Sequence, residues 1–251
     1  MLKESKTNDQ RLQVLTVIVL PVFNEFTTLP IFIEDLQLNI DKNTAIVVVD
    51  DSKPKVLDAS YKEISNIHIL ENSYKQGRGE AVRQGIKHAV INFPNATRII
   101  ESDSDGSHLV SDIVNIINQP LDYDLLIGSR YLNESQIINW PIYRRFFSFL
   151  LNFIIPKLIN VKSTDLTNGL RSYSLSSARM ILSHKNVLNG FMNLSETAKI
   201  ISKHELIIKE VPIKFTNRIA GKSSVTFNEL YKSIKGLTYL INFTGCDQCE
   251  F

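Results

Sequence analysis

Uninterrupted runs of aliphatic residues alternate with helix-like segments up to about residue 130, and this alternation is the feature that most restricts the fold. The runs "QVLTVIVLPV" (13–22) and "TAIVVVD" (44–50) lack polar alternation, which predicts strands buried on both faces. Shorter strands are expected at "NIHIL" (66–70), "TRII" (97–100) and "YDLLIGS" (123–129). The chain therefore contains at least five candidate strands separated by other elements.

The segments between these strands repeat apolar residues at helical spacing. The three sets are Leu29, Phe32, Ile33, Leu36 and Ile40; Ala81, Val82, Ile86 and Ala89; and Val110, Ile113, Val114 and Ile117. Strands that alternate with helices are typical of a parallel sheet covered on both sides. We therefore expect an α/β protein with a Rossmann-like, mostly parallel sheet and helices on both faces.

After residue 130 the alternation of strands with helices is less regular. We expect a long helix over Tyr143–Ile159, a small strand pair formed by "GLRSYS" and "IIKEVPIKF", and an amphipathic C-terminal helix. The apolar face of that last helix comprises Leu230, Ile234, Leu237 and Ile241. No linker-like composition divides the chain, which predicts one domain over residues 12–243, a disordered tail over 1–11 and a second tail over 244–251.

Composition excludes several classes of protein. A net charge of +2 over 251 residues does not indicate a nucleic-acid partner. The single C-x-x-C, Cys246 to Cys249, is weak evidence for zinc, and the polar N-terminus does not resemble a signal peptide. No run reaches the roughly 18 apolar residues of a spanning helix. The nearest, "FFSFLLNFII" (146–155), is either a buried helix or one lying at a membrane surface.

Acidic residues follow three of the predicted strands. Glu25 follows the first, Asp50 and Asp51 end the second, and Asp103 and Asp105 follow the fourth. The carboxyl ends of parallel strands meet at one rim, where ligands bind in such sheets. Three acidic strand ends on one rim predict a polar site assisted by a cation.

The D-x-D in "ESDSDGSH" admits three interpretations. A calcium loop is excluded, because a strand precedes it and no closing Glu follows. The aspartates could simply cap the next helix and form a turn. A carboxylate pair at a strand end can instead hold a hard divalent cation by one or two oxygens and leave its other positions to substrate phosphates.

Other nucleotide and hydrolase motifs are absent. The turn "PVFNEF" lacks the G-x-G-x-x-G of dinucleotide folds and the G-K-S/T of a P-loop, and no G-x-S-x-G elbow occurs.

Taken in order, the motifs resemble those of family-2 GT-A glycosyltransferases, and most closely the dolichyl-phosphate mannose synthase branch. They are "LPVFNE", "VVVDDSKP", "QGRGEAVRQG", "ESDSDGSH", "IGSRY", "NWPIYRR", "TDLTNGLRSY" and "EVPIKFTNRIAGKSS", and they extend from about Val14 to Val225.

The resemblance implies a nucleotide-sugar site formed by Pro21, Phe23, Asn24, Glu25, Val49, Asp51, Asp103, Ser104, Asp105, Arg218 and Lys222. Mg²⁺ or Mn²⁺ would bind at Asp103, Asp105 and Ser107, with Asp105 the direct ligand and Asp103 alternatively orienting the ribose or the loop. The family pattern R-x-x-G-x-S-K is broken here, because Ser224 replaces the lysine and Lys222 stands two residues earlier.

The resemblance also implies an acceptor-phosphate site at Arg130, Arg144 and Glu196, with both arginines and both aspartates catalytic. The alternatives are solvated surface charges for the arginines and a solvated helix position for Glu196. Asp165 and Gly169 match a loop that we expect to be structural.

The implied reaction is inverting transfer of a sugar, mannose from GDP-mannose in the first place, to a polyprenyl (dolichyl) phosphate at the cytoplasmic face of a membrane, with peripheral membrane contact and no nucleic acid. One alternative is a UDP-sugar-dependent transferase acting on undecaprenyl phosphate or a glycan. The other is a non-catalytic nucleotide-sugar-binding protein. The sequence alone does not name the sugar, the base, the lipid or any partner subunit.

Overall fold

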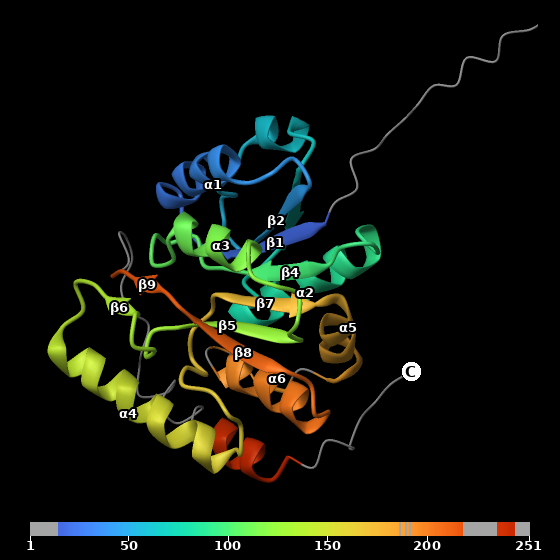
Figure 1. The fold of residues 1–251 in the computed structure, drawn as a ribbon. Helices are drawn as coiled ribbons and strands as arrows, with labels where there is room; N and C mark the ends of the chain where they lie inside the picture. Colours follow the sequence, from blue (N-terminus) through green and yellow to red (C-terminus); the bar gives the residue numbers. More distant parts are fainter. Residues whose placement is uncertain (1–14, 186, 189, 191, 218–234, 244–251) are drawn as a thin grey trace, which may run out of the picture.

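A computed structural model describes residues 15–185, 187–188, 190, 192–217 and 235–243. Its centre is a seven-stranded sheet in the order β3-β2-β1-β4-β7-β5-β8 (Figure 1). The strands are β1 (Thr16–Val22), β2 (Thr44–Asp50), β3 (Ile67–Glu71), β4 (Arg98–Glu101), β5 (Leu125–Ser129), β7 (Arg171–Ser174) and β8 (Ile208–Pro212). All neighbouring strands are parallel except β7, which is antiparallel to both β4 and β5. The predicted mostly parallel sheet is confirmed.

Helices cover both faces of this sheet, as expected. One face carries α1 (Thr28–Asn39) and α3 (Val110–Ile117), and the other carries α2 (Arg78–Asn92), α5 (Leu175–Ser183) and α6 (Met192–Lys203). Successive side chains of β1 enter the two hydrophobic layers in turn, because side chains of a strand alternate between faces. Every residue of β1 and β2 is buried, which explains their uninterrupted apolar sequences.

The expected small strand pair is wrong. β7 lies in the middle of the main sheet, between β4 and β5, and β8 extends the sheet beside β5. The segment "IIKEVPIKF" continues into β9 (Lys214–Phe215), which pairs with β6 (Gln136–Ile137). Strand-like sequence does not specify the partner strand, because pairing is decided by contacts distant along the chain.

Helix α4 (Ile142–Leu158) matches the predicted long helix, but it is not a core helix. Figure 1 shows it at the edge of the molecule, and only Asn152, Ile155 and Pro156 are buried. Phe146 and Phe147 are each 60% exposed, so the buried-helix interpretation of "FFSFLLNFII" is wrong. No helix within the described residues is both long enough and apolar enough to cross a membrane.

The C-terminal helix is described over residues 235–241. Leu240 is buried there and Ile241 is 46% exposed, so the predicted apolar face is partly wrong. Leu230 and Ile234, and the tails predicted at the two ends of the chain, lie outside the described residues.

Candidate active site

The polar rim lies where β1, β2 and β4 end. The chain leaves β1 toward β2 and leaves β4 toward β7 and β5, so β1 and β4 flank the point at which strand order reverses. Ligands of open α/β sheets bind in the crevice at this point. The structure brings the loops that carry the predicted acidic residues together at this edge of the sheet, and hydrogen bonds connect these loops.

Asp50, the last residue of β2, and Asp51, which follows it, hold the neighbouring loops. Asp50 accepts hydrogen bonds from the backbone N–H groups of Ser52 and Val56, both at 2.8 Å. One carboxylate oxygen of Asp51 accepts from the Asn72 side chain at 2.8 Å, and the other accepts from the backbone of Gln76 and Gly77 at 2.9 Å. Asp51 therefore fixes the loop that leads into α2.

The first turn is tied to its neighbours. The backbone N–H of Asn24, at φ 62°, donates to Ser52 Oγ at 2.7 Å. The hydroxyl of Ser104, the middle residue of the D-x-D, donates to Glu25. Phe23, in the turn after β1, is 41% exposed, with Lys75 Nζ 3.8 Å from its ring centroid.

Two residues expected at the nucleotide lie inside strands. Pro21 is buried in β1 and Val49 is fully buried in β2. The Val49 side chain packs against Gly85 of α2. Neither side chain is part of the exposed rim, and the contact of these two residues with the nucleotide stays a prediction.

Asp103, the first aspartate of the motif, forms an ion pair that the sequence did not reveal. Arg78 donates from Nε to Asp103 at 2.8 Å and from both terminal nitrogens to Glu101 at 3.3 Å. Burial opposes the charge on Arg78, but the two carboxylates outweigh it and raise the pKa of the guanidinium. Glu101, 1% exposed, also accepts from Tyr173 at 3.0 Å. Asp103 is therefore held toward the interior by Arg78.

Asp105 has a different environment. Its Oδ1 accepts from the backbone N–H of Ser107 at 3.0 Å and from the Ser107 hydroxyl at 2.6 Å. Gly106 between them has φ 83°, a conformation that favours glycine. The turn thus orients the Asp105 carboxylate through one of its two oxygens.

His108 secures the same turn. The backbone N–H of Asp103 donates to His108 Nδ1 at 3.0 Å, so the ring proton is on Nε2, which is 3.0 Å from Asn168 Oδ1. Asn168 in turn donates to the carbonyl of Gly128, at the end of β5. The role of His108 was missed, because its partner Asn168 is sixty residues away in the sequence.

Strand β9 joins the D-x-D turn to Arg130. Thr216 donates from its backbone to Ser107 at 3.1 Å and from its hydroxyl to Gly106 at 2.6 Å. The Phe215 ring lies 5.4 Å from the His108 ring and 5.2 Å from the Arg130 guanidinium. Phe215 therefore lies between the D-x-D turn, where a metal ion is expected, and Arg130, which is expected to bind the acceptor phosphate.

Arg130 is buried and paired, not solvated. Its Nε and Nη2 donate to the two carboxylate oxygens of Asp165 at 2.7 and 2.8 Å, and Nη2 also contacts Thr167 at 2.6 Å. Burial opposes the charge, but Asp165 and, to a smaller extent, Asp103 raise the pKa of Arg130. The surface-charge alternative for Arg130 is wrong. The fully buried Asp165 has the structural role expected of its loop.

Arg144 does not line the cavity that Arg130 lines. Its guanidinium lies 3.9 Å from the Trp140 ring centroid, and Nη1 donates to Asn217 at 3.0 Å. An open groove of about 370 Å³ instead runs between α4 and the segment after β5. Its lining comprises Arg130, Tyr131, Ser135, Ile137, Ile142, Arg145, Phe146 and Phe149.

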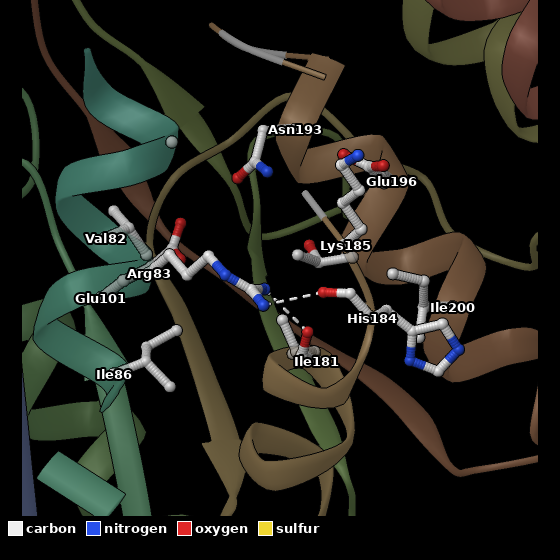
Figure 2. A pocket seen from close by; sticks show the side chains of 12 residues that line it. Val82, Arg83, Ile86, Glu101, Ile181, His184, Lys185, Asn193, Glu196 and Ile200 are labelled. Atoms are coloured by element: carbon white, nitrogen blue, oxygen red, sulfur yellow. Dashed lines mark hydrogen bonds between the residues drawn. The ribbon is translucent and has the colours of Figure 1, made fainter. Parts of the chain in front are cut away.

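Glu196 lies behind the rim, beside a small cavity between α2, α5 and α6 (Figure 2). It is 2% exposed and accepts hydrogen bonds from the backbone of Val187 and Leu188 at 3.1 and 3.0 Å. Burial raises the pKa of this carboxyl, against the effect of those two N–H groups. Figure 2 shows Arg83 pointing across the cavity to the carbonyls of Ile181 and His184. The solvated-helix alternative for Glu196 is wrong.

The residues of the rim suit a cation that is shared with a substrate. Among the described residues, no three His, Cys, Asp or Glu side chains form a group that could hold a metal by themselves. Asp105 offers a hard carboxylate oxygen on an ordered turn, which is the type of ligand that Mg²⁺ takes when phosphates complete its coordination. Arg218, Lys222 and Ser224, expected at the diphosphate, lie outside the described residues.

Comparisons with protein families, with curated proteins and with solved structures all find similar proteins. The glycosyl transferase family 2 model matches residues 17–182. An uncharacterized protein of Methanocaldococcus jannaschii is 34% identical over 200 residues, covering 78% of this chain and 79% of that protein. The undecaprenyl-phosphate mannosyltransferase of Micrococcus luteus is 26% identical over 232 residues, covering 90% and 93%.

The polyprenol monophosphomannose synthase of Mycolicibacterium smegmatis is also 26% identical, over 226 residues that cover 87% of this chain and 84% of that protein. Among solved structures, the glucosyl-3-phosphoglycerate synthase of Mycobacterium tuberculosis with Mn²⁺, UDP-glucose and phosphoglyceric acid superposes with a TM-score of 0.59. It is 15% identical and covers 91% of this chain and 80% of its own. This similarity establishes the same fold.

Proposed function

This chain belongs to glycosyl transferase family 2 and has the GT-A fold, and on that premise we propose that it transfers a sugar from a nucleotide-sugar to the phosphate of a polyprenyl lipid. The observation that carries the proposal is that two chemically different sites lie on opposite sides of Phe215. On one side lies the D-x-D turn, and on the other lies a groove that is lined by two arginines and by apolar side chains. Relatives with names of this type, the undecaprenyl-phosphate mannosyltransferase and the polyprenol monophosphomannose synthase, support the choice of acceptor.

The donor would bind across the ends of β1, β2 and β4. Phe23, exposed in the turn after β1, offers an aromatic face to a nucleobase, and Asn24, Glu25 and Asp51 organise the loops beside it. Asp105 would hold Mg²⁺ or Mn²⁺, which supplies positive charge to the diphosphate as it leaves. We assign Asp103 to positioning, because Arg78 and Glu101 already engage it.

The acceptor supplies its own nucleophile. A phosphate monoester has its second pKa near 6, so it is largely dianionic at neutral pH and needs no strong general base. Its oxygen forms a bond to the anomeric carbon while the bond from that carbon to the nucleoside diphosphate breaks, and attack from the opposite face inverts the anomeric configuration. Arg130 would orient the phosphate, since its Nη1 makes no hydrogen bond in the described part of the chain.

Helix α4 supports contact with a membrane. It carries exposed apolar residues around much of its circumference, with Arg144, Arg145 and Lys157 near its ends. Lysine and arginine can extend to the headgroups while aromatic and aliphatic side chains enter the acyl boundary. We propose peripheral attachment through α4, at the cytoplasmic face that the family resemblance implies.

The test is product formation from purified protein, Mn²⁺ and a polyprenyl phosphate, with GDP-mannose and UDP-hexoses compared as donors. We expect a lipid-linked sugar phosphate with inverted anomeric configuration, and GDP-mannose as the preferred donor. Transfer from a UDP-sugar only would establish the alternative donor class. Transfer to a glycan but to no lipid phosphate would refute the proposed acceptor.

A further inference from the structure

Four of the five histidines of the chain form two pairs that are not part of the rim. His184, directly after α5, lies beside His204, directly after α6, with 5.3 Å between the ring centroids. His68 of β3 and His88 of α2 form the second pair, and their ring centroids are also 5.3 Å apart. The two pairs have the same spacing, so the hydrogen bonds of each ring decide what it can bind.

His184 has an unprotonated ring nitrogen in the interior. Its Nδ1 lies 2.9 Å from the carbonyl oxygen of Met180, which can only accept a hydrogen bond, so Nδ1 carries the proton and Nε2 is an acceptor. The residue is 7% exposed, and Nε2 is buried without a hydrogen-bond partner among the described residues. Figure 2 shows the ring on the side away from Arg83, which binds the His184 carbonyl. A buried acceptor without a partner is costly, which indicates that a ligand uses this lone pair.

His204 is positioned to share such a ligand. Its ring is tilted by 76° relative to the ring of His184, and the residue is exposed, which gives an ion access from solvent. With Zn–N bonds of about 2.0–2.1 Å in a tetrahedral arrangement, two imidazoles that bind one Zn²⁺ have ring centres about 5 Å apart. The observed distance of 5.3 Å between His184 and His204 matches this geometry.

The surroundings of the pair favour a metal cation. A carbonyl that accepts from one ring nitrogen fixes the tautomer of a metal-binding histidine and leaves the other nitrogen to the metal, and Met180 does this for His184. Both histidines follow the C-terminal end of a helix, where free carbonyl groups attract positive charge. Lys185 and Lys203, their neighbours in the sequence, oppose a cation, but both are exposed and their charges are screened by solvent.

The pair of His68 and His88 lacks the unprotonated buried nitrogen. The Asn92 amide donates to His88 Nδ1 at 3.3 Å, so the ring proton is on Nε2, and this buried nitrogen has no described partner. A nitrogen that carries a proton has no free lone pair for a metal. This pair therefore provides an internal control with the same ring spacing and the opposite tautomer.

We propose that His184, through Nε2, and His204 together bind Zn²⁺, and that this ion links the C-terminal ends of α5 and α6. Imidazole nitrogens suit Zn²⁺, whereas Mg²⁺ and Mn²⁺ prefer oxygen ligands, so the site is distinct from the one expected at Asp105. Water completes the coordination, since no third His, Cys, Asp or Glu among the described residues joins the pair. The ion stabilises the folded protein by mass action, independently of the proposed reaction.

The experiment is calorimetric titration of Zn²⁺ into the untagged full-length protein, with excess Mg²⁺ present to occupy carboxylate sites. Cys246 and Cys249 could bind Zn²⁺ themselves, so the parent protein and every variant carry Cys246→Ser and Cys249→Ser. We expect His204→Gln to weaken Zn²⁺ binding at least about tenfold, since loss of even a hydrogen bond behind a metal ligand costs about 10–100-fold. His184→Gln should show the same loss, and His68→Gln should bind like the parent.

Thermal unfolding provides a second measurement. Saturating Zn²⁺ should raise the midpoint temperature of the parent and of His68→Gln but not that of His204→Gln, whose exposed position preserves the fold. Absence of Zn²⁺ binding by the parent, or parent-like affinity in His204→Gln or His184→Gln, would overturn the assignment. An equal loss of affinity in His68→Gln would also overturn it, because Zn²⁺ would then bind histidines without regard to the tautomer.

Discussion

The donor rim and the groove beside α4 lie on either side of Phe215 and are constructed in opposite ways. In the rim, Asp50, Asp51 and Asp103 are held by backbone N–H groups or by Arg78; Asp50 and Asp51 are buried, and the Asp103 side chain is 20% exposed. Along α4, aromatic rings are more than half exposed, and the side chain of Arg145 forms no hydrogen bond or ion pair with a described residue. The difference matches the two ligands proposed: a sugar nucleotide needs fixed polar contacts, whereas a lipid chain needs an open apolar surface.

The two regions also differ in how much the order and the hydration of their side chains would change when a ligand binds. Ordered carboxylates in the rim lose little freedom when a donor binds, which is the advantage of a preorganised site. The apolar side chains of α4 remain hydrated until something covers them, and an apolar surface of this extent indicates a binding site. The following predictions test this contrast, beginning with the largest expected effect.

Asp105→Asn should reduce kcat by about 10²–10³-fold, the size of effect expected when charge stabilisation of a leaving group is lost. Asparagine can still accept the hydrogen bonds from Ser107, so the variant removes charge and preserves the turn. The measurement is the rate of sugar transfer, together with calorimetric titration of Mn²⁺ in the presence of nucleoside diphosphate. Asp41→Asn, in an exposed turn, is the control. Normal turnover and normal Mn²⁺ affinity in Asp105→Asn would contradict the site.

Arg130→Ala should lower the free energy of unfolding by about 3 kcal/mol, because it leaves the fully buried Asp165 without its counter-ion. Urea unfolding followed by circular dichroism measures this change. Arg145→Ala is the matched control from the same groove, and its stability should change by less than about 0.5 kcal/mol. If Arg130→Ala and Arg145→Ala lowered the free energy of unfolding equally, the ion pair between Arg130 and Asp165 would not contribute to stability as proposed.

Phe147→Ser should weaken binding to lipid vesicles about tenfold, since the ring is 60% exposed on α4 and its apolar area would enter the membrane. Co-sedimentation with vesicles measures the bound fraction. Leu38→Ser removes an 80% exposed apolar residue from α1 and should leave binding unchanged. If both variants sediment like wild type, α4 is not the membrane-contacting helix.

Glu196→Gln should change how stability depends on pH. Burial raises the pKa of Glu196 in the folded protein above its value in the unfolded chain, about 4.3. Its contribution to stability is therefore complete below the unfolded pKa and is lost as pH rises through the folded pKa. Relative to wild type, the glutamine variant should become more stable as pH increases through this interval.

Urea unfolding at a series of pH values measures this difference, with the exposed Glu34→Gln of α1 as control. A constant difference between Glu196→Gln and wild type at every pH would show that the carboxyl does not titrate with a raised pKa. The effect is the smallest of the four, because two backbone N–H groups partly offset the burial.

Local sequence predicted the layers of the fold well. The strands β1 and β2 and the helices α1, α2 and α3 follow from apolar runs and from helical spacing, which are properties of ten to fifteen consecutive residues. The D-x-D and its place at the end of β4 were likewise evident. The partners of β7 and β8 were not, because strand pairing depends on residues as distant as Glu101 and Arg171.

The sequence by itself determined the α/β architecture, the acidic rim and the family, because each is encoded in local patterns and ordered motifs. Only the tertiary structure decided which charges are paired. Arg78 holds Asp103, Asp165 holds Arg130, and α4 directs Arg145 toward the groove while Arg144 lies on Trp140. The physical reason is that the charge available to a ligand depends on neighbours in space, and packing brings those neighbours from distant parts of the chain.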